Sequence, residues 1–320
     1  MRVLFAGSAG IAVPSLIAVS ELKEIDLCGV LTNPDTPKGR HGTPVPTEIG
    51  EAAEAQRTQR EELLLIKPAK LDAAAREQIA ALRPDLLVSF AYGRLFGPKF
   101  MALFPLGGIN IHPSLLPKYR GPSPIQAAIL NRDTITGVSI QTLAQEMDSG
   151  DILAVEQFEL TGSETSDSLS NTAARIASEM LPETLLKIAA GKIETKAQEH
   201  ENATYCKLIQ KNDGIIDWSL SAAQIDAKIR AFNPWPLCRT FHNGKELLIL
   251  KADVYRGYMD AALSSERKPG MVLGIDKQCG ILIQTGDGVL IVSELQYQAK
   301  KALFWRDFLN GARDFPGSQL

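Results

Sequence analysis

Three side chains of this sequence could together move an acyl group between two nitrogen atoms. Asn110 and His112 lie two residues apart, and Asp148 follows in the turn-rich peptide Met147-Asp-Ser-Gly-Asp151. An amide can hydrogen-bond to an oxygen that becomes anionic, an imidazole can move a proton near neutral pH, and a carboxylate can stabilise the charged imidazole. These residue types predict an enzyme that transfers an acyl carbon.

The spacing of Asn110 and His112 predicts that they work from one surface. Residues two apart on a β-strand point to the same face of the sheet, and Pro113 ends the predicted strand directly after His112. Asp148 taken alone is typical of a turn, because its side chain hydrogen-bonds to nearby backbone. Beside an imidazole it would raise the histidine pKa and favour the imidazolium. Asp151 could serve as that carboxylate equally well, and the residue types do not choose between the two.

The elements that must position these residues form an α/β pattern. Short apolar runs alternate with helical periodicity, which predicts a doubly wound, mostly parallel sheet with helices on both faces. Ligands of such sheets bind beyond the carboxyl ends of the strands, where residues 110 and 112 would lie. The expected strands are 2–6, 25–31, 63–66, 85–90, 107–112, 136–143 and 152–160, and the expected helices are 13–20, 46–55, 72–82, 123–131 and 166–190.

The character of the chain changes after this region. Residues 193–206 are polar and non-periodic, which predicts a linker between a catalytic domain at 1–192 and a second domain at 207–320. The second domain has a helical pattern at 222–230, and Asn243-Gly244 and Asp287-Gly288 are strong hairpin signals. Five short strands predict a small OB-like β-barrel, a frequent platform for nucleic acid. These strands are 237–241, 246–254, 270–275, 280–284 and 289–295.

Composition excludes several classes of protein. The chain has 320 residues, 45% of them hydrophobic, so it can bury the cores of two domains. No apolar run approaches the roughly 20 residues that span a bilayer, and the first residues read as a core strand rather than a signal peptide. We therefore expect no membrane contact and a cytoplasmic location. The net charge of −3 argues against unaided, nonspecific binding of nucleic acid.

Several cofactor and metal motifs are missing. The four cysteines are scattered without a CxxC pair, so neither a disulfide framework nor a zinc site is expected. The turn Gly7-Ser-Ala-Gly10 lacks the second glycine of GxGxxG, which argues against a nicotinamide cofactor. The Pro/Gly-rich loop at 34–42 carries Lys38 and Arg40. It is either a solvated surface loop or a mobile arm that contacts a phosphate backbone.

The motifs resemble those of the folate-dependent formyltransferases, which take a formyl group from 10-formyltetrahydrofolate. Asn110-x-His112-x-Ser-Leu-Leu-Pro117, Arg120-Gly121 and Asp148-x-Gly150-Asp151 carry the resemblance. Further segments are similar to the members of this family that act on initiator tRNA, so the resemblance covers nearly the whole length. These segments are Asn33-Pro-Asp-x-Pro-x-Gly-Arg40, Ile229-Arg-Ala-Phe-Asn-Pro-Trp-Pro236, Gly270-Met-Val272, Leu295-Gln296 and Lys300-Lys301.

The resemblance implies transfer of the formyl group to the α-amine of methionyl-initiator tRNA for translation initiation. The catalytic roles would fall on Asn110, His112 and Asp148, and no metal would be needed. Contact with the tRNA would involve Lys38 and Arg40 together with the OB-like domain, and a monomer would suffice. The implied folate contacts are Ser89, Phe90, Ala91, Tyr92, Ser114, Leu115, Leu116 and Pro117.

Three other functions remain open at this stage. The formyl group could pass to the amine of a sugar nucleotide, because the catalytic module is shared between the two reactions. The protein could also hydrolyse 10-formyltetrahydrofolate without any acceptor. From a different class, it could bind folate or RNA without catalysis, which an intact set of Asn110, His112 and Asp148 disfavours.

Overall fold

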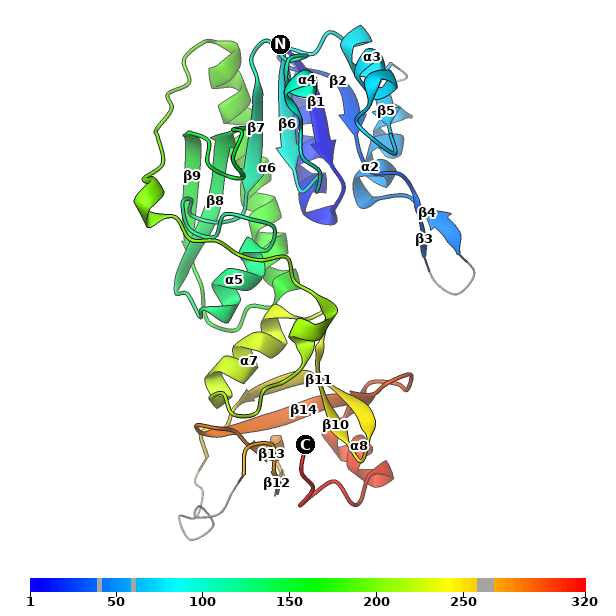
Figure 1. Cartoon of the computed structure of the whole chain (residues 1–320), viewed down its shortest axis with the longest axis vertical. Helices are drawn as coiled ribbons and strands as arrows, with labels where there is room; N and C mark the ends of the chain where they lie inside the picture. The colour runs from blue at the N-terminus through cyan, green and yellow to red at the C-terminus, as the bar shows by residue number, and fades with distance from the viewer. Residues whose placement is uncertain (39–41, 59–61, 258–267) are drawn as a thin grey trace. The chain divides into compact units, whose positions relative to one another are not determined.

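The computed structural model describes residues 1–38, 42–58, 62–257 and 268–320, and the chain divides into two compact units (Figure 1). Unit 1 comprises Met1–Pro124, Ile135–Glu159 and Leu169–Lys207, and unit 2 comprises Ile125–Thr134, Leu160–Ser168 and Leu208–Leu320. Two short segments from the middle of the chain therefore cluster with the C-terminal part. The domain limits drawn at 192 and 207 remain a prediction.

Unit 1 is built on a seven-stranded sheet with the order β5-β2-β1-β6-β7-β8-β9. The first five strands of this order are parallel, whereas β8 and β9 are antiparallel to their neighbours. The expected mostly parallel sheet is confirmed. β9 runs antiparallel to β8 because the loop between them, residues 143–151, is too short for the crossover that parallel strands need. The strands are β1 Arg2–Gly7, β2 Asp26–Leu31, β5 Leu64–Ile66, β6 Leu86–Phe90, β7 Gly108–His112, β8 Ile135–Thr142 and β9 Ile152–Glu159.

Polar side chains cap the start of two helices in this part of the chain. The Thr47 hydroxyl accepts from the Gly50 amide at the start of α2, and the Asp72 carboxylate accepts from the Ala75 amide at the start of α3. The predicted helices are confirmed to within a few residues, and the short α4 was not predicted. The helices are α1 Val13–Glu21, α2 Glu48–Arg57, α3 Ala73–Ala81, α4 Pro98–Met101, α5 Pro124–Leu130 and α6 Ser166–Ala189.

Unit 2 is β-rich, as expected, and its main sheet has the antiparallel order β10-β11-β14-β13-β12. Both hairpin predictions are confirmed: Asn243-Gly244 joins β10 to β11, and Asp287-Gly288 joins β13 to β14. The strand β15, which pairs with β14, and the helix α8 were not predicted. The elements are α7 Ala222–Ala231, β10 Cys238–His242, β11 Lys245–Val254, β12 Val272–Asp276, β13 Gly280–Gln284, β14 Val289–Tyr297, β15 Leu303–Phe304 and α8 Trp305–Gly311.

The basic loop at 34–42 contains a small two-stranded hairpin that the sequence did not predict. β3 Thr36–Lys38 pairs with β4 Thr43–Val45, and Lys38 lies opposite Thr43. Arg40 lies outside the described residues. An arm at this place therefore has a paired stem, and its proposed contact with RNA stays a prediction.

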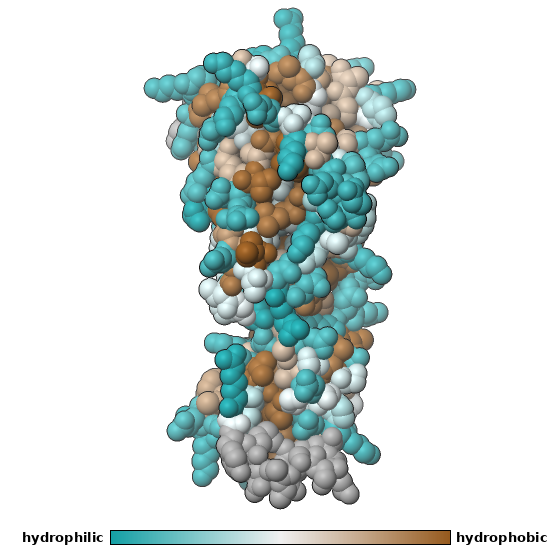
Figure 2. Space-filling model, turned by 90° about the vertical axis from the view of Figure 1, so that its left-hand side faces the viewer, coloured by the Kyte–Doolittle hydropathy of each residue, from teal (hydrophilic) through white to brown (hydrophobic). Residues whose placement is uncertain are grey.

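The side of the molecule drawn in Figure 2 carries mostly polar side chains, with apolar ones gathered in patches between them. Among the residues that the structure describes, no helix is both long and apolar enough to cross a membrane.

Candidate active site

The centre of the site is the carboxyl end of β7. Asn110 and His112 lie on this strand, opposite Gln141 and Ser139 of β8, and Ser89 of β6 is the neighbour of Asn110 on the other side. Because alternate residues of a strand share a face, the sheet presents the amide and the imidazole together. The predicted pair thus sits at the strand end where ligands of such sheets bind.

The loop between β8 and β9 brings Asp148 to this pair. Its Oδ2 lies 3.6 Å from His112 Nδ1, and the Asn110 amide nitrogen donates to its Oδ1 at 3.4 Å. Asp148 has a left-handed backbone with φ +54°, a conformation that Asp tolerates better than most residues. Asp151 is exposed; its backbone amide donates to the Thr142 hydroxyl at 2.9 Å, and its carbonyl accepts from the Thr142 amide at 2.9 Å. The structure therefore brings together Asn110, His112 and Asp148.

Two glycines allow the Asp148 carboxylate to reach its place. The backbone amide of Gly121 donates to Oδ2 at 2.8 Å, and Gly121 has φ +116°, a region that favours glycine. At Gly150 a Cβ atom would lie 1.8 Å from the carbonyl oxygen of Thr142, so a larger residue would push the loop away from β8. The left-handed backbone at Gly121 and the lack of space at Gly150 explain why the sequence has glycine at both positions.

His112 is buried, and its hydrogen bonds define its tautomer. Nε2 lies 2.9 Å from the carbonyl oxygen of Tyr119, which can only accept, so Nε2 carries a proton and donates it. In the neutral ring, Nδ1 then carries no proton, and its lone pair faces Asp148. A proton received at Nδ1 would lie between the ring and the carboxylate, at a separation longer than a direct hydrogen bond.

The charge state of His112 differs from the expected imidazolium. Burial lowers the pKa of His112 below its ordinary value, and it outweighs the Asp148 carboxylate and the hydrogen bond to Tyr119, which both raise it. The sequence revealed the carboxylate but not the burial of the ring. The resting imidazole is therefore neutral near pH 7, and it is placed to accept a proton beside an anion.

Three site residues were missed or only partly seen from the sequence. Gln141 donates from Nε2 to Asp148 Oδ1 at 3.1 Å, and Gln198 donates to the Asp148 carbonyl at 3.0 Å. Arg120 entered only as part of a motif, yet its side chain is buried and donates to Gln198. No local pattern marks the two glutamines; the register of β8 opposite Asn110 could have pointed to Gln141.

The segments expected to contact folate lie on both sides of Asn110. Ser89 and Phe90 end β6, and Ala91 is exposed with φ +50°. The Tyr92 ring instead packs in the hydrophobic core, so this segment offers mainly backbone and the Ala91 methyl group. After β7, Ser114 is fully buried, and its hydroxyl donates to the Lys118 carbonyl at 2.6 Å.

The rest of that second segment packs onto β8. The Leu116 amide donates to the Ser139 hydroxyl at 3.2 Å, and the Leu115 side chain lies over Gly137, where a Cβ atom would approach it to 2.4 Å. Leu115 and Pro117 are partly exposed. Ser114 therefore shapes the loop, whereas Leu115 and Pro117 have surface left for a ligand.

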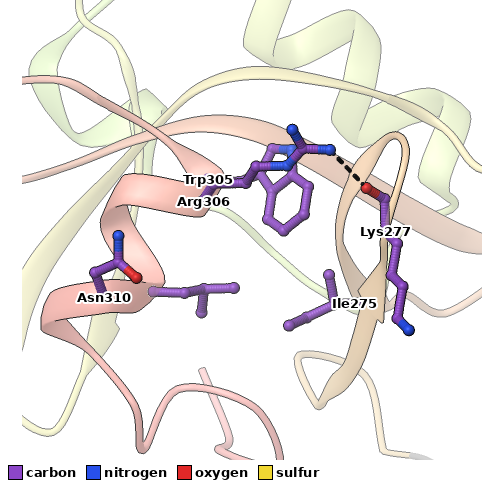
Figure 3. Close-up of a pocket in the computed structure, with 6 residues that line it drawn as sticks. Ile275, Lys277, Trp305, Arg306 and Asn310 are labelled. Carbon is purple, nitrogen blue, oxygen red and sulfur yellow. Dashed lines mark hydrogen bonds between the residues drawn. The ribbon is translucent and has the colours of Figure 1, made fainter.

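Unit 2 has a cavity of about 490 Å³ between the β12–β13 turn and α8 (Figure 3). The Arg306 guanidinium lies 5.0 Å from the ring centroid of Trp305 and donates to the Lys277 carbonyl at 2.8 Å. Ile275 and Leu309 supply apolar lining. Among the described residues, no group of three or more His, Cys, Asp or Glu side chains could hold a metal ion.

Two family models match this chain, and both describe formyl transferases. The model of the formyl transferase family matches residues 1–185, and the model of the formyl transferase C-terminal domain matches residues 208–313. The chain is 48% identical to the methionyl-tRNA formyltransferase of Treponema denticola over 318 residues, 98% of each chain. It is 42% identical to that of Treponema pallidum, covering 98% of this chain and 97% of the relative.

Two solved structures share the fold. An N-formyltransferase from Helicobacter canadensis, solved with folinic acid and dTDP-3-aminofucose, matches with a TM-score of 0.65 and 18% identity over 91% of this chain and 98% of its own. HypX from Aquifex aeolicus, solved with tetrahydrofolic acid, matches with a TM-score of 0.61 and 18% identity over 97% of this chain and 47% of its own. At these identities the likeness concerns the fold alone.

Proposed function

The chain belongs to the formyl transferase family, and we infer that it transfers the formyl group of 10-formyltetrahydrofolate to the α-amine of methionyl-initiator tRNA. The observation that carries this function is the identity of 48%, over 98% of both chains, with a relative named for it. The match extends through both domains, as expected for an acceptor that both help to hold. The cluster of Asn110, His112 and Asp148 suits the chemistry.

Asn110 is proposed to stabilise the oxygen of the reacting group. 10-Formyltetrahydrofolate supplies the formyl carbon, and attack by the amine places negative charge on the formyl oxygen. The Asn110 side-chain amide donates one long hydrogen bond of 3.4 Å to Asp148, so its second N–H can donate to the formyl oxygen. Loss of one such donor typically costs on the order of 10²–10³ in rate.

His112 and Asp148 are proposed to handle the proton of the attacking amine. His112 is neutral at rest, so its Nδ1 can accept the proton directly or through one water. The imidazolium that forms lies 3.6 Å from the Asp148 carboxylate, which stabilises it until the proton passes to the departing folate nitrogen. Neither step requires a metal or a covalent intermediate with the protein.

The folate donor is proposed to lie along the backbone of Ser89–Tyr92 and against Leu115 and Pro117. The exposed Ala91 and the partly exposed Leu115 and Pro117 fit a flat ring, because they offer backbone groups and apolar surface. Both segments adjoin Asn110: Ser89 is its neighbour in the sheet, and Leu115 follows β7. The residues present therefore fit the donor.

Contact with tRNA is proposed at two places. Lys38 ends β3, Arg40 follows it in the sequence outside the described residues, and cationic side chains such as these bind phosphates. In unit 2, Lys277 and Arg306 line a cavity with an apolar floor, which suits a nucleotide. We also propose that the protein acts as a monomer in the cytoplasm, where its tRNA substrate is used.

The test is an acceptor assay with the purified full chain and radiolabelled 10-formyltetrahydrofolate. Methionyl-initiator tRNA, an amino-sugar nucleotide and buffer alone are compared as acceptors. The proposal expects label in the tRNA, and Asn110→Ala and His112→Ala should lose most of the turnover while tRNA affinity persists. Label in the sugar nucleotide instead, or formate release that does not depend on tRNA, would overturn it.

A further inference from the structure

We propose that Gln198, held by the buried Arg120, is a positioning residue for Asp148, so that the segment at 193–206 forms part of the catalytic site. This inference rests on the proposed function of Asp148. The segment was expected to be a simple linker, yet it runs back over unit 1. Lys196 pairs with Ile152, and Tyr205 pairs with Arg120.

The Gln198 side chain has a unique orientation. Its Nε2 donates to the carbonyl oxygens of Asp148 at 3.0 Å and Gly150 at 2.6 Å. Its Oε1 accepts from Arg120 Nε at 3.1 Å and Nη2 at 2.7 Å. A flipped amide would set donors against the guanidinium and an acceptor against the carbonyls, so the two ends of the side chain fix its orientation.

A hydrogen-bonded chain runs from Arg120 through this amide to the catalytic carboxylate. The two N–H groups of Gln198 are shared among three acceptors, the third being Gln141 Oε1 at 3.1 Å, and Gln141 Nε2 donates to Asp148 Oδ1 at 3.1 Å. Each amide donates in the same direction, from the guanidinium toward the anion. Hydrogen bonds in such a series polarise one another, and each is stronger where the dielectric constant is low. The cation therefore supports the Asp148 carboxylate from a distance.

The hydrogen-bonded series from Arg120 to Asp148 is shielded from water. The exposed fractions are 2% for Arg120, 6% for Gln198 and 1% for Gln141. The recorded partners of the Arg120 guanidinium within the described residues are Gln198, His200 Nδ1 and the Tyr205 hydroxyl, and none of them is a carboxylate. Its charge thus acts through neutral amides, and the anion at the far end is Asp148.

Gln198 holds the part of the loop that most needs support. Asp148 adopts a left-handed backbone, which costs energy and persists only where the surroundings hold it. Gln198 binds the carbonyl of this residue, while Gln141 and the Gly121 amide bind its carboxylate. Without Gln198 the loop can relax, and the carboxylate moves away from His112.

The experiment compares Gln198→Glu, Gln198→Met and the control Gln157→Glu in the full chain. Glu keeps the acceptor for Arg120 but loses both N–H donors and adds a buried charge. Met keeps the length of the side chain without any strong hydrogen bond. Gln157 is exposed on β9, so the control makes the same charge change away from the site. Thermal denaturation checks that each variant is folded.

Both Gln198 variants should lose roughly 10- to 100-fold in kcat with little change in KM, because a small misplacement of a catalytic group costs about this much. In Gln198→Met the Asp148 carboxylate moves away and stabilises the imidazolium less, so the acidic limb of the kcat profile should move to lower pH. In Gln198→Glu the added negative charge acts in the opposite direction, so the acidic limb should lie at higher pH than in Gln198→Met. The control should match wild type in all three measurements.

A second readout does not depend on catalysis. The His112 imidazole is titrated by NMR, and Gln198→Met should lower its pKa relative to wild type, whereas Gln157→Glu should leave it unchanged. A wild-type kcat or an unchanged His112 titration in the folded Gln198→Met protein would overturn this inference and leave the proposed function intact. A wild-type protein that formylates no tRNA would instead overturn the proposed function, and the titration would still decide on Gln198.

Discussion

Replacing Asp148 by Asn tests the proton step most directly, because the side chain keeps its shape and loses its charge. The carboxylate lies 3.6 Å from His112 Nδ1. At an effective dielectric constant of about 20, two unit charges at this separation attract by about 5 kcal/mol, equivalent to roughly three pKa units. The imidazolium that forms during the reaction would lose most of this stabilisation.

The same substitution also disturbs the hydrogen bonds of the loop. Asp148 Oδ2 accepts from the Gly121 amide at 2.8 Å, and Oδ1 accepts from Gln141 Nε2 at 3.1 Å and from the Asn110 amide at 3.4 Å. An Asn side chain has one acceptor and one donor, so it must set its NH₂ group against one of these donors. Gln141 cannot simply turn, since its Oε1 already accepts from Gln198. The variant should lose about 1–3 kcal/mol of unfolding free energy.

The assay measures kcat and KM for methionyl-initiator tRNA with saturating formyl donor. We expect kcat to fall by about 10²–10⁴, the usual contribution of a positioned proton-transfer group, with KM for tRNA nearly unchanged. Asp151→Asn is the matched control, because this neighbouring carboxylate is exposed. A folded Asp148→Asn protein with wild-type kcat would refute the reasoning. So would an equal loss in the Asp151 variant, which would point to the charge of the loop as a whole.

Three further predictions follow from burial and packing. The chain has four histidines, so NMR can resolve His112, whose pKa should lie below its ordinary value; a raised pKa would contradict the neutral resting state. Such a lowered pKa stabilises the fold above the unfolded value, near pH 6.5, and this contribution should disappear in denaturation experiments as the pH falls through the folded value. Gly150→Ala should cost about 1–3 kcal/mol of stability because its Cβ overlaps a backbone carbonyl, whereas Gly97→Ala, with open space around it, should cost little in the same denaturant titration. Burial raises the pKa of Cys238 to about 12, so a thiol reagent at pH 8 should modify the exposed Cys279 first and reach Cys238 only after unfolding; equal rates in the native protein would contradict its burial.

The fold class could be predicted because local patterns agree with the tertiary structure over most of the chain. The strand at 107–112 and the helix at 166–190 have clear periodicity and end signals, and both are present. The direction of β8 was harder to predict, because this strand is buried along most of its length, as the parallel strands are, and lacks the alternation typical of antiparallel strands. The helix α8 was missed because its seven residues are too few for a helical period to stand out.

The candidate site, like the fold, was predictable from the sequence only in part. The types and spacing of Asn110 and His112, with the Gly-containing turn around Asp148, were enough to predict an acyl-transfer cluster, because strand geometry sets which side chains share a face. What depended on the tertiary structure was the choice of Asp148 over Asp151, the neutral charge of His112, and the amide chain from Arg120. Each of these follows from burial and from contacts between residues far apart in sequence, such as Gln198 and Asp148, whose separation no local pattern records. Side-chain chemistry is a property of residue type, whereas dielectric and hydrogen-bond partners exist only once the chain has folded.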